Sequence, residues 1–222
     1  MPTESPLAQG SYRALAATAN AFARESHVDE LAWRLGVDPV AFRRAHLADD
    51  RLRRVLEVAA ERIGWRGPVG DLPGQGFGVA VGLEKGGRVA TAAEVRVRDG
   101  VPEVVRLVTA FACGAIVHPA GLENQVQGAT LMALGGALFE AVGFRGPEVQ
   151  TASFGSYRVP RFRDVPEVEV VLLDRRDLPP AGGGETPMIA VAPAVANALR
   201  AATGRRLHHL PLLGPAYAGA SA

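Results

Sequence analysis

The sequence predicts an α+β fold, and three observations indicate it. Apolar residues at helical spacing fill the first third of the 222-residue chain, and alternating apolar residues around a hairpin signal follow. A further helical stretch, a strand and an Ala/Val-rich helix complete the order. The change of composition at residues 67–73 divides a helical segment, residues 1–66, from an α+β part, residues 67–222. We expect N-terminal helices, a central antiparallel sheet, a crossing helix and a C-terminal strand-loop-helix.

Three helices are predicted in the first segment, after a flexible start over residues 1–11. The first spans residues 19–35 and ends at Gly36. Asp38 is followed by Pro39, which predicts an N-cap with proline in the first helical position and a short helix to residue 47. Asp50 opens the third, whose apolar residues repeat at helical spacing up to Gly64.

The middle of the chain predicts antiparallel strands. Glycines at residues 74, 76 and 78 lead into a strand, and we interpret them as a strand entry or as places where another backbone approaches. Residues 89–97 and 104–111 flank the pair Asp99 and Gly100, which is a strong hairpin signal.

The second half returns to helical character over residues 123–142. Gly128, Gly135 and Gly136 interrupt that stretch, and small residues there allow either packing of another helix or close approach of a flat ligand. Residues 166–173 alternate and then become wholly apolar, which predicts a sheet strand. The polar loop of residues 174–181 follows it.

Composition limits the classes of function. A net charge of +1 gives no reason to expect nucleic acid or an acidic membrane as partner, and no apolar run reaches transmembrane length. One cysteine, Cys113, rules out an intrachain disulfide or an iron–sulfur cluster built from this chain alone. No signal peptide is recognised, so we expect a cytoplasmic protein, or a periplasmic one if a partner carries it there.

No motif in the sequence indicates a metal site built from protein ligands or a serine nucleophile. The five histidines lack metal-ligand spacing, so we expect no metal held by protein ligands. Ser153 and Ser156 lie in no nucleophile elbow.

The segment that best suits chemistry is Gly182, Gly183, Gly184 and Glu185. Three glycines let backbone approach a ligand closely, and one carboxylate follows them before an apolar helix that ends near Gly204. If that carboxylate is desolvated, its pKa rises and it becomes a general base. The alternative is an acid that complements the positive end of the helix.

Two side-chain amides, Gln125 and Gln127, lie near the start of the helical stretch. They suit hydrogen bonding to a polar heterocycle, but they suit a solvated first turn equally well.

The order of several short segments resembles a known family. The segments are residues 12–13, 20–26, 29–32, 38–43, 113–119, 124–128, 157–160, 182–185, 196–199, 202–204 and 210–211. In this order they resemble the C-terminal part of the molybdopterin-binding large subunit of the xanthine oxidase family. The most similar branch is the isoquinoline oxidoreductase beta subunit, which is aldehyde dehydrogenase-like.

The resemblance implies a molybdopterin cofactor, in the cytosine dinucleotide form, and oxidation of an aldehyde or an N-heterocycle. Glu185 matches the acid that activates the molybdenum-bound hydroxyl as general base. Gln125 matches a residue lining the pterin, Arg13 lies in a segment near the molybdenum oxygens, and Gly184 allows close approach of the cofactor. The pterin holds the metal, which agrees with the lack of protein ligands.

The resemblance also implies partners. A second molybdopterin-binding chain would supply the missing half of the pocket, an iron–sulfur subunit would take the electrons, and a large apolar face would be exposed on the isolated chain. Two positions depart from the family, because Ala112 stands where many relatives have an acid and His118 where they have asparagine. The alternative is a non-catalytic remnant or assembly subunit that has lost cofactor binding.

Overall fold

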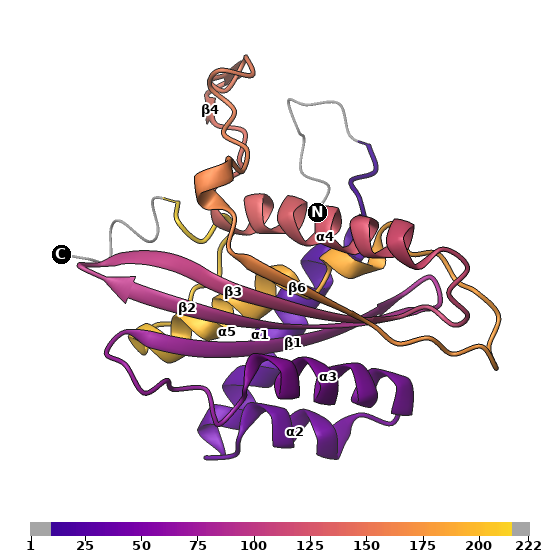
Figure 1. The fold of residues 1–222 in the computed structure, drawn as a ribbon. Coiled ribbons are helices and arrows are strands. Elements are labelled where there is room, and N and C mark those ends of the chain that lie inside the picture. Colours follow the sequence, from indigo (N-terminus) through magenta and orange to yellow (C-terminus); the bar gives the residue numbers. More distant parts are fainter. Residues whose placement is uncertain (1–9, 215–222) are drawn as a thin grey trace.

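A four-stranded sheet forms the centre of the molecule, in a computed structural model that describes residues 10–214. The strands lie in the order β1-β2-β3-β6. A separate two-stranded hairpin, β4 and β5, extends away from the body (Figure 1). The elements in chain order are α1 (Leu15–Arg34), α2 (Pro39–His46), α3 (Asp50–Ile63), β1 (Gln75–Glu84), β2 (Gly87–Arg98), β3 (Val101–Ala112), α4 (Pro119–Leu138), β4 (Phe144–Arg145), β5 (Glu148–Val149), η1 (Phe162–Asp164), β6 (Glu167–Leu172), η2 (Thr186–Met188) and α5 (Val191–Thr203).

The sheet is mixed. β1, β2 and β3 are antiparallel neighbours, whereas β6 pairs parallel with β3, from Arg106 opposite Glu167 to Phe111 opposite Leu172. The α+β class, the central antiparallel strands and the C-terminal strand are confirmed, and the structure adds that this strand joins the sheet parallel to β3. Parallel neighbours need a long crossover connection, and α4 lies within that connection here.

Helices cover both faces of the sheet. In Figure 1, α2 and α3 lie below the sheet, α4 lies above it, and α1 and α5 pass behind it. One apolar core joins α3 to the sheet, and a second joins the sheet to α1, α4 and α5. The helices of residues 1–66 therefore contribute to the same cores as the strands that follow.

The predicted N-terminal helices are present, with shifts at their ends. Asp38 caps α2 as expected, since its carboxylate accepts hydrogen bonds from the N–H groups of Val40 and Ala41. Asp49, one residue earlier than predicted, caps α3. α1 begins at Leu15 and not at residue 19. Residues 1–9 of the predicted flexible start lie outside the described residues.

The hairpin signal and the strand glycines are also confirmed. Asp99 and Gly100 both have positive φ, 51° and 74°, as a two-residue turn between β2 and β3 requires. Gly76 and Gly78 lie against the backbone of α5, where a Cβ would come within 2.3 Å and 2.2 Å of carbonyl oxygens. They are backbone-approach sites, and they let α5 pack directly on β1.

The helix predicted over residues 123–142 lies four residues earlier, over α4. His118 caps it by accepting a hydrogen bond from the Gly121 N–H, and Pro119 takes its first position. The expectation that another helix packs on Gly135 and Gly136 was wrong. A Cβ at Gly135 would meet Glu140 and Pro160, and one at Gly136 would face the Tyr12 hydroxyl.

A buried ion cluster joins the N-terminal helices to the C-terminal segment. Arg43 of α2 donates to the carboxylate of Glu25 on α1 at 2.9 Å, and both side chains are almost fully buried. Arg206 pairs with Asp29 on α1 and donates to Asn197 on α5. The cluster fixes α1 against α5 and so helps to place the residues just before α1.

No helix within residues 10–214 combines the length and the apolar character needed to cross a membrane.

Candidate active site

The loop that carries Gly182 to Glu185 is held by the segment that follows β3. The Ala181 N–H donates to the Cys113 carbonyl at 2.6 Å, and the Ala115 N–H donates to the Leu178 carbonyl at 3.2 Å. Gly114 has a φ of 83°, and a Cβ there would come within 2.0 Å of the Pro179 oxygen. These contacts anchor the loop to the end of the sheet.

The β1–β2 hairpin lies on the other side of this loop. The Thr186 hydroxyl donates to the Glu84 carbonyl at 2.9 Å. A Cβ at Gly87 would come within 3.1 Å of the Thr186 hydroxyl oxygen. The backbone before and after Glu185 is therefore fixed by two different parts of the sheet.

Glu185 forms an ion pair with Lys85 at the tip of that hairpin. Its side chain is 32% exposed. The hydrogen bond from the Lys85 ammonium holds the pKa of the Glu185 carboxyl below its usual range. The expected desolvated carboxylate with a raised pKa was therefore wrong, because a cation 100 residues away in the chain reaches it.

The alternative role of Glu185 at a helix start is not what its side chain does. Glu185 precedes the short helix η2, and its carboxylate makes no capping hydrogen bond there. α5 begins only at Val191, after that turn. The carboxylate therefore lies outside the helix, where it can contact other groups.

Arg13, from the segment before α1, contacts the same loop. Its Nε donates to the Gly184 carbonyl at 2.7 Å, and its Nη2 donates to the same oxygen. The Ala14 backbone N–H also lowers the pKa of the Glu185 carboxyl. Ala14 and Leu15 have positive φ, 66° and 50°, which is uncommon for residues with a Cβ. The structure thus brings Arg13, Gly184 and Glu185 together.

One face of α4 adjoins the same region. A Cβ at Gly183 would meet Leu122, and the Arg13 Nη1 lies 3.6 Å from the Met132 sulfur. Gln125 lies three residues after Leu122 and seven before Met132, so helical spacing places it on the face that these contacts define. Gln125 is exposed, and a Cβ at Gly128 would meet nothing within 4 Å. This face is open.

The two departures from the family pattern have local explanations. His118 acts as the N-cap of α4, a role that asparagine also performs. Ala112, at the end of β3, is buried in the core that joins α3 to the sheet. Neither residue leaves a free polar group at the site.

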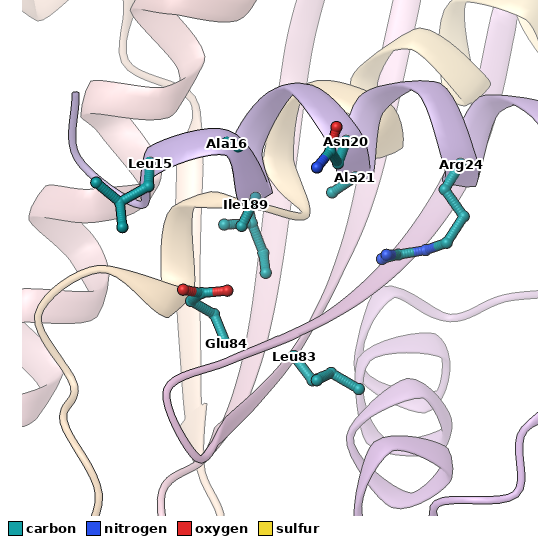
Figure 2. Close-up of a pocket in the computed structure, with 9 residues that line it drawn as sticks. Leu15, Ala16, Asn20, Ala21, Arg24, Leu83, Glu84 and Ile189 are labelled. Carbon is teal, nitrogen blue, oxygen red and sulfur yellow. The ribbon is translucent and has the colours of Figure 1, made fainter. Parts of the chain in front are cut away.

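A cavity of about 360 Å³ lies beside this region, between α1 and the β1–β2 hairpin. In Figure 2 the Glu84 carboxylate points from the hairpin toward α1, and Asn20 and Arg24 project from α1. The cavity is also lined by Leu15, Ala16, Ala17, Ala21, Leu83 and Ile189. Within residues 10–214, no group of three or more His, Cys, Asp or Glu side chains is arranged to hold a metal ion.

Lys85 is the residue that sequence reasoning did not assign. It is the only lysine of the chain, whose other basic residues are arginines, and that singularity is the one signal that could have drawn attention to it. Its distance in sequence from Glu185 hid the pairing.

Comparison with known proteins agrees with the resemblance. Residues 79–166 match the molybdopterin cofactor-binding domain family. The chain is 34% identical over 226 residues to a nicotinate dehydrogenase subunit of Pseudomonas putida, covering 94% of this chain and 19% of that protein. It is 33% identical over 198 residues to the beta subunit of isoquinoline 1-oxidoreductase from Brevundimonas diminuta, covering 86% and 25%.

The fold is shared with a solved structure. The aldehyde oxidoreductase from Desulfovibrio desulfuricans superposes with a TM-score of 0.72 over 90% of this chain and 40% of that one, at 16% identity. By comparison, this chain spans about a fifth to a quarter of the length of the two curated relatives.

Proposed function

Because the chain is related over most of its length to molybdenum-binding subunits of the xanthine oxidase family, we propose that it forms one wall of a molybdopterin site. In this proposal it supplies Glu185 as the general base of a molybdenum hydroxylase. The observation that carries the proposal is the convergence of Arg13, Gly184 and Glu185 beside an open face of α4.

The residues present fit part of such a cofactor. Gln125 offers an exposed amide that can both donate and accept hydrogen bonds. A Cβ at Gly128, Gly182 or Gly184 would meet nothing within 4 Å, so the backbone at these positions is open to close approach. These positions would hold the pterin, and its cytosine dinucleotide form is our choice by the family resemblance.

Each residue has a role that its contacts support. When bound, the cofactor supplies the two-electron oxidant and the oxygen nucleophile. Glu185, which Lys85 holds in an ion pair, would be the group of this chain that accepts the proton. Arg13 fixes the Gly184 peptide and so the orientation of the carboxylate.

The relatives support a proposal for the substrate class and for the partners. The relatives include a nicotinate dehydrogenase, an isoquinoline 1-oxidoreductase and an aldehyde oxidoreductase, so we propose an N-heterocycle or an aldehyde as substrate. A second molybdopterin-binding chain would close the pocket, and an iron–sulfur subunit would take the electrons.

An exposed apolar surface supports the need for such a neighbour. Phe154 and Phe162 are fully exposed, and Met132 and Val165 are about 40% exposed. Leu131, Met132, Pro160, Phe162 and Val165 line one hollow beside α4. Such a surface is typical of a protein interface.

The test is molybdenum content and turnover. We would purify the chain alone and together with the protein encoded beside it, and measure molybdenum by mass spectrometry. The complex is expected to retain molybdenum and to oxidise a heterocycle or an aldehyde. Glu185→Gln should keep the metal and lower kcat by roughly 10²- to 10⁴-fold, the usual contribution of a general base.

The control is Glu61→Gln, which removes an exposed carboxylate on α3. It should leave both the metal content and kcat unchanged. A complex without molybdenum would reject the catalytic proposal and leave the assembly role.

A further inference from the structure

The β1–β2 hairpin presents a single cation to Glu185. Its two-residue turn is Lys85 and Gly86, with φ values of 45° and 83°, and Glu84 pairs with Gly87 across it. A two-residue hairpin turn requires positive φ at both positions, so the hairpin itself sets the backbone conformation of Lys85. The turn aims the ammonium at the Glu185 carboxylate.

The hairpin is held in place by contacts other than the ion pair. The Thr186 hydroxyl bonds the Glu84 carbonyl, and a Cβ at Gly86 would come within 3.0 Å of the Ala181 Cβ. The turn is therefore packed against the loop on both sides of Glu185. Without the ion pair, the backbone would still bring residue 85 to the same place.

We propose that Lys85 is a positioning residue for Glu185, orienting its carboxylate as a proton acceptor. The inference rests on the proposed function for the identity of the proton donor. The coupling between the two side chains does not depend on the proposed function, because both side chains belong to this chain.

The other charges near the pair agree with this role. Arg13, from the segment before α1, is the second cation that acts on Glu185, and its guanidinium is engaged by the Gly184 carbonyl. Glu84 acts on Lys85 from the neighbouring position and favours its charged form. Glu185 in turn raises the pKa of the Lys85 ammonium, and Lys85 lowers the pKa of the Glu185 carboxyl.

The first test is an NMR titration of the full 222-residue chain with ¹³C-labelled glutamate. The Glu185 signal is identified by its loss in Glu185→Gln. In Lys85→Met we expect the Glu185 pKa to rise, and in Lys85→Arg we expect it to return toward the wild-type value. An unchanged Glu185 pKa in Lys85→Met, with the fold intact by circular dichroism, would overturn the proposal.

The second test leaves Lys85 in place, so it remains decisive if Lys85→Met fails to fold. Reductive ¹³C-methylation labels one side-chain amine, because the chain has one lysine. The Lys85 pKa should fall in Glu185→Gln relative to wild type. Equal values in the two proteins would show that the pair is not formed.

In the molybdenum-containing complex, the acidic limb of the kcat/KM profile should move to higher pH in Lys85→Met and be restored in Lys85→Arg. An unmoved limb in an active Lys85→Met complex would reject the role of Lys85 while the proposed function stands. A wild-type complex without molybdenum would reject the proposed function, and the two NMR titrations, which need no cofactor, would still decide whether the pair is coupled.

Discussion

Arg13 donates two hydrogen bonds to the carbonyl oxygen of Gly184, although 171 residues separate them in the chain. The contact joins the segment that precedes α1 to the loop that presents Glu185. Because segments from distant parts of the chain meet there, the site depends on the whole fold and not on a local motif.

Arg13→Gln should loosen this loop. A hydrogen bond from a charged group contributes about 1.5–3 kcal/mol when buried, and Arg13 is half-buried, so we expect a loss of about 1–2 kcal/mol. For a chain of this size that corresponds to a fall in Tm of roughly 2–8 °C by calorimetry. Arg66→Gln, at an exposed position, is the control, and an equal fall in both variants would argue against the contact.

Gly128→Ala should separate stability from cofactor binding. In the interior of α4, with nothing near its Cβ, alanine should raise the free energy of unfolding by about 0.5–1 kcal/mol. If the cofactor lies on this face, the bulkier Gly128→Leu should lower the molybdenum content of the complex. Glu123→Leu adds a similar side chain on another face of α4 and should leave the molybdenum content unchanged. Equal molybdenum content in the wild type, Gly128→Leu and Glu123→Leu would place the cofactor elsewhere.

Arg43→Met should be among the most damaging changes distant from the site. It removes the buried cation of the Glu25 carboxylate and leaves only the exposed Arg24 beside it, and removing one partner of a buried pair costs about 3–5 kcal/mol. Urea unfolding at neutral pH measures the loss. Arg54→Met, which breaks an exposed pair with Glu57, should cost less than about 1 kcal/mol, and similar losses in the two variants would contradict the burial argument.

Tyr157 should titrate unusually late. Burial and the hydrogen bond that its hydroxyl donates to Glu140 raise the pKa of Tyr157 to about 12, from an ordinary 10.0. Because the folded-state pKa is raised, the stabilisation is present below about pH 10 and is lost as the pH rises toward 12. The ultraviolet difference titration between wild type and Tyr157→Phe checks the value, and a transition near 10 would contradict it.

Local signals explain how much of the fold was predictable. The Asp38 cap, the Asp99–Gly100 turn and the terminal Gly204 were recognised because each depends on the backbone preferences of a few adjacent residues. The predicted end of a helix differed from the observed one where an uncommon residue caps the helix, as His118 does at the start of α4. Glu185 and its glycines were recognisable for the same reason, because they adjoin one another.

The sequence by itself determined the helices, the strands of the main sheet and their order, and it marked Glu185 as the candidate acid. Only the tertiary structure decided that β6 lies parallel to β3, that Arg13 reaches Gly184, and that Lys85 lowers the pKa of Glu185. The physical reason is that turn, cap and periodicity preferences act over a few residues. Strand pairing, burial and ion pairs depend instead on distances that exist only once segments about 60 to 170 residues apart have packed together.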